Sequence, residues 1–201
     1  YMAPELARGV GTDVGPWTDV YLLGAILCEL LTGRPPHRGK SLHKVVTQAV
    51  YGKPPVLDPS LPQELRVACL RAVARAPEDR FQTVAELQAA VRDYLRHRES
   101  GLISESAREQ LDRCVRVANE AQGAEASDSL YTDFASAVAG FAQALVLWEG
   151  NEPARDGEWA ARLAYAEAAL GQDDLGLAAS LARALTTDDS ARQAQKRGLL
   201  G

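Results

Sequence analysis

The chain has 201 residues, of which 46% are hydrophobic and 24% charged, and its net charge is −5 at pH 7. This composition is ordinary for a globular protein, and few aromatic residues beside abundant alanine and leucine favour helices that pack on helices. No clustered basic surface indicates nucleic-acid binding, and the spacing of the cysteines and histidines matches no metal site.

The charge is unevenly divided along the chain. Residues 1–99 carry 13 basic and 11 acidic side chains, whereas residues 100–201 carry 9 and 16, and we interpret the acidic half as a solvated helix surface. The longest apolar run, residues 21–31, is about half a membrane span and contains Glu29. No signal peptide is recognised. We therefore expect a cytoplasmic protein without a membrane segment.

The first long helix that the sequence predicts covers residues 19–31, which are apolar on almost every side. Thr18 can cap its start, and Gly33 followed by Pro35 and Pro36 ends it. A helix without a polar face is typical of a buried position in a larger domain. We expect the isolated first half of the chain to expose part of this helix as an apolar patch and to self-associate.

Three further helices are predicted before the middle of the chain. Residues 42–51 form a short one, and an apolar stripe predicts a second within residues 62–75. Thr83 and Glu86 make a capping box, in which side chains and backbone donors satisfy each other, at the start of the third. The polar stretch RHRESG at residues 96–101 is the predicted domain boundary.

The second half predicts helices at regular spacing. One amphipathic helix ends near Gly123, and a linker follows at residues 123–129. The segments FAQAL at 141–145 and LARAL at 181–185 repeat after 40 residues, which indicates stacked helical hairpins. We expect the tail after Leu185 to fray. Apolar residues recur at three- and four-residue steps in three helices: Phe134, Val138, Phe141, Leu145 and Trp148; Trp159, Leu163, Ala166 and Leu170; and Ala178, Leu181 and Leu185.

Two glycine-containing stretches do not meet the requirements of phosphate-binding loops. In GVGTDVG, residues 9–15, the third glycine is one residue too late for a dinucleotide fingerprint. In GRPPHRGKS, residues 33–41, five residues separate the glycines where a P-loop has four, and two of them are prolines that cannot donate an N–H. Neither stretch follows a predicted strand, so both are interpreted as ordinary loops.

Three motifs occur in an informative order: YMAPE at 1–5, TDVYLLGAILCELLTGRPPH at 18–37 and PEDRFQTVAEL at 77–87. Together they resemble the back half of a protein kinase domain, in particular the bacterial serine/threonine kinases of eukaryotic type. Ala3-Pro4-Glu5 matches the A-P-E that closes the activation segment. The aspartate, tyrosine and glycine within the second motif match the start of the central buried helix of that fold. The resemblance covers residues 1 to about 97.

The resemblance implies roles for five residues. Glu5 and Arg80 should form a largely buried ion pair that ties the end of the activation segment to the last helices. Asp19 should brace the catalytic loop, or act only as a charge at a helix N-terminus. Tyr1 and Met2 correspond to the loop that receives the substrate residue next to the phosphoacceptor. No catalytic, cofactor-binding or metal-binding residue is assigned in this chain.

The groups that carry out phosphoryl transfer in this family are a glycine-rich loop, a lysine, a catalytic-loop aspartate and asparagine, and a D-F-G aspartate that holds Mg²⁺. The family places all of them before A-P-E, and the 201 residues contain none. We therefore expect ATP and Mg²⁺ as the cofactors of the intact kinase. By resemblance the protein is a transferase, whereas this chain by itself should bind no ATP and transfer no phosphate.

The second half resembles the tetratricopeptide class of helical repeats. ALVLWEGN at 144–151 resembles the end of one repeat, with Glu149 where the family often has proline, and residues 171–185 resemble the second helix of the next. The 40-residue period exceeds the usual 34, so the first helix of the unit must be longer. The resemblance implies a protein or peptide partner on a concave helical surface. A helical appendage that only packs on the kinase lobe is the alternative.

The sequence thus predicts an all-α protein in four parts. Residues 1–97 form a partial kinase domain, 98–127 a connecting helix and linker, 128–187 a tetratricopeptide-like region, and 188–201 a tail. The expected function is that of a piece of a serine/threonine kinase, which in the intact protein phosphorylates protein hydroxyls. The alternative is a non-catalytic helical scaffold or protein-binding module derived from a kinase. Expected partners are protein substrates of the intact kinase, with neither nucleic acid nor membrane.

Overall fold

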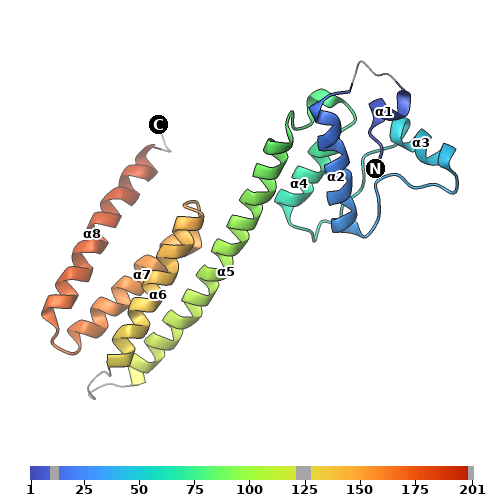
Figure 1. The fold of residues 1–201 in the computed structure, drawn as a ribbon. Helices are drawn as coiled ribbons and strands as arrows, with labels where there is room; N and C mark the ends of the chain where they lie inside the picture. Colours follow the sequence, from blue (N-terminus) through green and yellow to red (C-terminus); the bar gives the residue numbers. More distant parts are fainter. Residues whose placement is uncertain (10–13, 121–127, 199–201) are drawn as a thin grey trace. The chain divides into compact units, whose positions relative to one another are not determined.

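The computed structural model describes residues 1–9, 14–120 and 128–198, and every regular element in them is a helix (Figure 1). No strand occurs in these ranges, so the predicted all-α fold is confirmed for this part of the chain. The elements are α1 (Pro4–Arg8), α2 (Pro16–Thr32), α3 (Leu42–Tyr51), α4 (Gln63–Ala72), the 3-10 helix η2 (Pro77–Asp79), α5 (Val84–Glu120), α6 (Asp128–Leu147), α7 (Glu152–Leu170) and α8 (Leu175–Gly198).

The helices belong to two compact units, Tyr1–Leu95 and Arg96–Gly201. The division between the units falls at the start of the polar stretch 96–101, which is the predicted boundary, and helix α5 continues through this stretch without a break. This stretch contains no proline, and its arginine and glutamate residues are good helix formers. Its Ser100 is fully buried and donates a hydrogen bond to the carbonyl oxygen of Ala144 at 2.7 Å. A polar sequence therefore continues as a helix because one of its residues has a partner in the core.

Helix α2 lies at the centre of the N-terminal unit and packs on α4 (Figure 1). The two helices approach so closely that a Cβ added to Gly24 would lie 2.5 Å from the Cβ of Ala72. Around this crossing lies an apolar core to which Val20, Phe81 and Leu87 contribute. Glycine at this point of the sequence is therefore required by packing.

One face of α2 is not covered. Leu23, Ile26 and Leu30 are 40%, 46% and 78% exposed, and their spacing of three and four residues places them on one side of the helix. The expected apolar patch is present, on a helix whose other residues form the core of the unit. Self-association through this patch stays a prediction.

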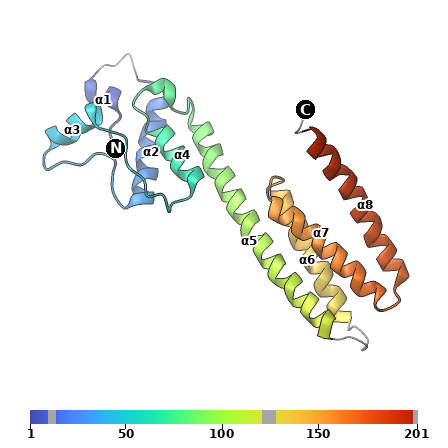
Figure 2. The same cartoon turned by 180° about the vertical axis from the view of Figure 1, so that it is seen from behind.

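In the C-terminal unit α6 packs on α7 and α7 on α8, and α6 and α7 lie side by side in both views (Figures 1 and 2). A tetratricopeptide-like repeat stays a prediction. Phe134 and Phe141 of α6 are fully buried, as the predicted apolar seam requires. The core also contains Ala107 and Leu111 of α5 and Ala161 of α7.

The buried face of α7 differs from the one that the apolar spacing predicts. Apart from Glu158, its buried residues are alanines and one glycine, and Ala166 is the one residue of the predicted seam among them. A Cβ added to Gly157 would lie 2.2 Å from a ring carbon of Phe141. Trp159 and Leu163 are only partly buried, and Leu170 is 54% exposed. Phe141 comes so close to α7 that only glycine fits at position 157, whereas Tyr165 of α7 stacks on the Phe134 ring.

The ends of the predicted connections also differ. Most of the predicted linker at 123–129 lies outside the described residues, and α6 begins at Asp128. Helix α8 continues to Gly198, so most of the predicted fraying tail at 188–201 has helical backbone. Alanine, glutamine, lysine and arginine prevail in this stretch, and all are good helix formers.

One segment among the described residues, Ser129–Leu147 in α6, is long and apolar enough to cross a membrane by length and composition alone. Such a segment is weak evidence for a membrane span because core helices pass the same test. Phe134, Ala137, Phe141 and Ala144 of this segment are fully buried among the neighbouring helices. One face of this apolar segment thus lies in the core of the C-terminal unit.

Candidate functional site

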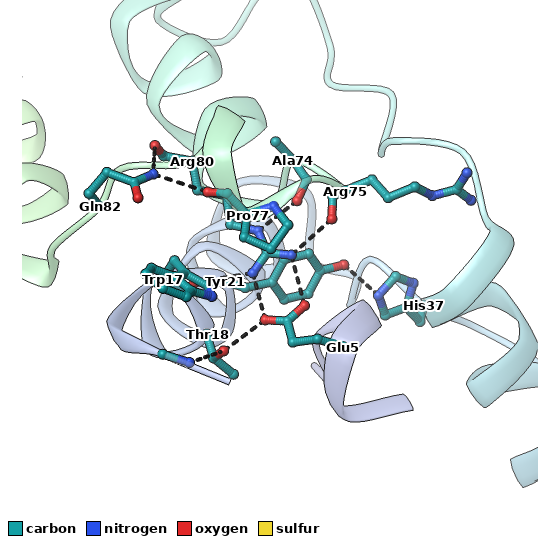
Figure 3. Close-up of polar contacts among 11 residues, drawn as sticks. Glu5, Trp17, Thr18, Tyr21, His37, Ala74, Arg75, Pro77, Arg80 and Gln82 are labelled. Carbon is teal, nitrogen blue, oxygen red and sulfur yellow. Dashed lines mark hydrogen bonds and ion pairs between the residues drawn. The ribbon is translucent and has the colours of Figure 1, made fainter. Parts of the chain in front are cut away.

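Arg80 is fully buried, with 1% of its surface exposed, and every N–H of its guanidinium has an acceptor (Figure 3). An arginine side chain has five such donors, so none is left unsatisfied in the core. Nε donates to the Ala74 carbonyl oxygen at 2.7 Å, Nη1 to Glu5 Oε1 at 2.8 Å and the Trp17 carbonyl oxygen at 3.2 Å, and Nη2 to Glu5 Oε2 at 3.0 Å and the Arg75 carbonyl oxygen at 3.1 Å.

Glu5 is buried to the same extent and receives Arg80 with both carboxylate oxygens. The hydroxyl of Thr18 donates a further hydrogen bond to Oε1 at 2.8 Å. Burial alone would raise the pKa of Glu5, but the hydrogen bonds from Arg80, its own backbone and Thr18, together with the Arg80 charge, hold the pKa below 4.5. The pair is therefore ionised at neutral pH and its charges compensate each other.

Short elements hold the two charged residues in position. Pro4 is the first residue of α1, so Glu5 lies in the first helical turn, where the partial positive charge of the helix favours a carboxylate. On the other side, the 3-10 turn Pro77–Asp79 leads into Arg80, whose backbone is extended. The sequence P-E-D-R thus turns the chain so that the arginine side chain enters the core.

Thr18 has a different role from the predicted one. Helix α2 begins at Pro16, so Thr18 is its third residue and not its cap. The Thr18 hydroxyl accepts a hydrogen bond from the backbone N–H of Gly15 at 3.2 Å and donates its own proton to Glu5. Because the proline fixes the start of the helix, the threonine side chain is available to the ion pair.

Tyr21 and His37 complete this cluster, and the sequence did not single them out as partners (Figure 3). The Arg80 guanidinium carbon lies 4.7 Å from the centre of the Tyr21 ring, within the range of a cation–π contact. The Tyr21 hydroxyl hydrogen-bonds to Nε2 of His37 at 2.7 Å. Burial raises the pKa of Tyr21 to about 12, and burial also lowers the pKa of His37. Both rings are therefore neutral at pH 7.

The other three predicted residues lie apart from the ion pair. Tyr1 and Met2 are about half exposed, and the Tyr1 hydroxyl donates a hydrogen bond to Glu29. Asp19 is exposed in the first turn of α2, where its charge suits the helix N-terminus. The catalytic-loop role of Asp19 and the substrate role of Tyr1 and Met2 stay predictions.

The cluster around Glu5 and Arg80 is suited to holding segments together rather than to proton transfer. Its charges are paired, buried and fully hydrogen-bonded, so a substrate atom has no access to them. The cysteines offer no nucleophile either, because Cys28, Cys69 and Cys114 are buried and free, and burial raises the pKa of Cys69 to about 12. In the described ranges, no three histidine, cysteine or acidic residues are grouped as a metal site requires.

The buried pair of Glu5 and Arg80, next to the central helix α2, agrees with the predicted resemblance to the C-lobe of a protein kinase. Comparison with known proteins agrees with this class. The chain is 43% identical over 94 residues to the serine/threonine-protein kinase PknB of Mycobacterium tuberculosis, 40% over 96 residues to the probable serine/threonine-protein kinase CE0033 of Corynebacterium efficiens, and 34% over 98 residues to the serine/threonine-protein kinase PknH of Mycobacterium bovis.

These alignments cover 44% of this chain with the first two relatives and 47% with the third, a share close to the length of the N-terminal unit. The chain spans only 14% to 16% of the length of these relatives. No protein-family model matches it. The chain thus contains a segment related to bacterial serine/threonine protein kinases.

Proposed function

We propose that the N-terminal unit is the base of the C-lobe of a serine/threonine protein kinase, and that the intact protein transfers phosphate from ATP, with Mg²⁺, to serine or threonine hydroxyls of proteins. The buried, doubly hydrogen-bonded pair of Glu5 and Arg80 is the observation that carries this proposal. The pair fixes the end of the activation segment, which must be held in place for a substrate to lie against it. In this proposal Tyr1 and Met2 contribute to the substrate platform, and the kinase domain acts in the cytoplasm.

A chimera tests this proposal. Residues 1–95 of this chain would replace the matching residues of the Mycobacterium tuberculosis kinase PknB, and transfer of radiolabelled phosphate from ATP to protein would be measured. We expect the chimera to be active, and the same chimera with Arg80→Ala to lose most of its activity. A chimera that unfolds cooperatively and binds Mg·ATP, yet transfers no phosphate, would overturn the proposal.

We further propose that the 201 residues alone do not bind ATP, since the sequence contains no glycine-rich loop, H-R-D or D-F-G segment. The measurement is the thermal midpoint of the chain with and without millimolar Mg·ATP. No shift is expected, and a ligand that bound the folded chain would raise the midpoint. A reading frame that encodes H-R-D and D-F-G directly upstream of Tyr1 would support the kinase proposal.

The second candidate function is a non-catalytic protein-binding scaffold derived from a kinase. The stacked hairpins of α6, α7 and α8 favour it, because stacked hairpins present continuous helical surfaces that bind peptides or proteins. Phosphate transfer by the chimera would favour the kinase, whereas a chimera that folds but stays inactive would favour the scaffold.

A further inference from the structure

A cavity of about 240 Å³ lies in the N-terminal unit, on the side of Tyr21 that faces His37. Its walls come from α1, α2, the end of α3 and the segments that follow α3 and α4. A cavity of this size is smaller than the pockets of about 300–1,000 Å³ that hold drug-sized ligands. It is larger than the roughly 150 Å³ that accommodates a benzene molecule. One large apolar side chain therefore matches it best.

The walls of the cavity are apolar and stiff. Pro4, Pro54 and Pro55 contribute rigid rings, and Ala49 and Val73 add aliphatic surface. Prolines have a fixed φ and lose little freedom on binding, so the cavity is largely preformed. The transfer of an apolar side chain from water into the cavity is favourable, and the protein does not have to rearrange to accept it.

The charged side chains around the cavity are all basic. Lys53 and Arg75 are the charged residues of its lining, His37 is neutral at pH 7, and none of its twelve lining residues is aspartate or glutamate. Lys53 and Arg75 are exposed, and a hydrogen bond of 3.1 Å from Arg75 to the carbonyl oxygen of Gly52 fixes the guanidinium. Figure 3 shows that this guanidinium points away from Glu5. The negative charge of Glu5 is already compensated by Arg80 and does not neutralise the basic residues.

We propose that this cavity binds an acidic peptide segment of a partner protein, which inserts one large apolar side chain between the prolines and places its carboxylates against Lys53 and Arg75. The combination of an apolar cavity and basic residues decides this choice. A free anion would gain nothing from the proline walls, and a neutral apolar peptide would gain nothing from the basic side chains. The cavity adjoins the first residues of the chain, since Pro4 and His37 line it and the backbone of Met2 hydrogen-bonds to His37. The inference goes beyond the proposed function and does not require that the intact protein transfer phosphate.

Fluorescence anisotropy of the full 201-residue chain with labelled heptapeptides tests this proposal. Three peptides carry three acidic residues on each side of a central phenylalanine, leucine or alanine. A fourth peptide carries three lysines on each side of a central phenylalanine. We expect the phenylalanine and leucine peptides to bind at least about tenfold more tightly than the alanine peptide, because their side chains are buried. The lysine peptide should bind more weakly than any acidic one.

Two matched variants locate the site. Lys53→Glu reverses a charge of the cavity lining and should weaken binding of the phenylalanine peptide by roughly fivefold to tenfold. Lys40→Glu makes the same charge change at an exposed lysine outside the lining and should leave binding within about twofold. Equal effects of the two variants would overturn the proposal, as would equal affinities of the phenylalanine and alanine peptides. A single-stranded oligonucleotide with the same net charge as the phenylalanine peptide is a further control. If it bound as tightly as that peptide, the site would recognise negative charge alone and the proposal would be overturned.

Discussion

The two units of the chain are both helical, but different interactions in their cores stabilise them. In the N-terminal unit, Glu5 and Arg80 are separated by 75 residues in sequence and joined by two hydrogen bonds in the core. In the C-terminal unit, Phe134 stacks on Tyr165, Phe141 packs against Gly157, and buried polar contacts join Ser100 to Asn151 and Ala144. The comparison teaches that the first unit should be sensitive to changes of charge as well as of volume, and the second mainly to changes of volume.

The largest expected effect is that of Arg80→Ala in the N-terminal unit. Removal of one partner from a buried ion pair costs about 3–5 kcal/mol, because the other charge stays buried without compensation. Hydrogen exchange resolved by segment should show faster exchange in α2 and α4 and unchanged exchange in α7. The control is Arg162→Ala, which removes a partly exposed pair with Glu158 at 2.8 Å and should cost less than about 1 kcal/mol. Equal effects of the two substitutions would contradict the comparison.

Gly157→Ala should be the most damaging small change in the C-terminal unit. The new methyl group would lie 2.2 Å from the Phe141 ring, and overpacking of this kind costs about 1–3 kcal/mol. The measurement is the free energy of unfolding in urea, together with exchange in α6 and α7. The double variant with Phe141→Leu should recover part of the loss because the ring is no longer there. No recovery would indicate that the close approach to Phe141 is not the cause.

The stability of the N-terminal unit should depend on pH more strongly than that of the C-terminal unit, because of the buried Glu5. The pKa of Glu5 is lower in the folded than in the unfolded state, so the unfolded chain binds more protons as the pH falls. The contribution of Glu5 to the free energy of unfolding is fully present above about pH 4.5, the usual pKa of glutamate. It is lost as the pH falls through the pKa of Glu5 in the folded state. The protection factors in α2, which are corrected for the intrinsic exchange rate at each pH, should therefore fall on acidification more steeply than those in α7. In Glu5→Gln this difference in slope should disappear, and a slope that persists would contradict the assignment.

The smallest expected effect is a stabilisation. Gly101 lies within α5, and a Cβ added there would meet no heavy atom within 4 Å. Alanine is a better helix former than glycine by up to about 1 kcal/mol, so Gly101→Ala should raise the free energy of unfolding by roughly that amount. This variant is also the matched control for Gly157→Ala, since both make the same chemical change in a helix. Destabilisation by Gly101→Ala would contradict the geometry of α5.

The sequence predicted the features that depend on residue type at a fixed spacing. Helix α3 has the predicted bounds, and the pairing of Glu5 with Arg80 followed from a kinase resemblance. Tyr21 and His37 could not be identified as partners, because their contact depends on how the loop after α2 returns to the helix. The spacing of apolar residues indicates which face of a helix is buried. It does not indicate how large a side chain the neighbouring helix leaves room for. For this reason the spacing of Trp159 and Leu163 was a poor guide to the buried face of α7.

Helix α5 shows that a polar stretch can lie at the division between two units without breaking the helix. A polar stretch is typical of a linker, yet the hydroxyl of Ser100 accepts a hydrogen bond from the Asn151 side chain at 2.8 Å as well as donating one to Ala144. Both contacts come from residues more than 40 positions away. Local sequence carries no information about them.

The separation of Glu5 from Arg80 in sequence also has a consequence for the order of folding. A charge that enters the core before its partner arrives is costly, so the pair should form only after α2 and α4 have packed. Interactions that form late change the unfolding rate and leave the folding rate nearly unchanged. The pair should therefore slow the unfolding of the N-terminal unit and have little effect on its folding rate.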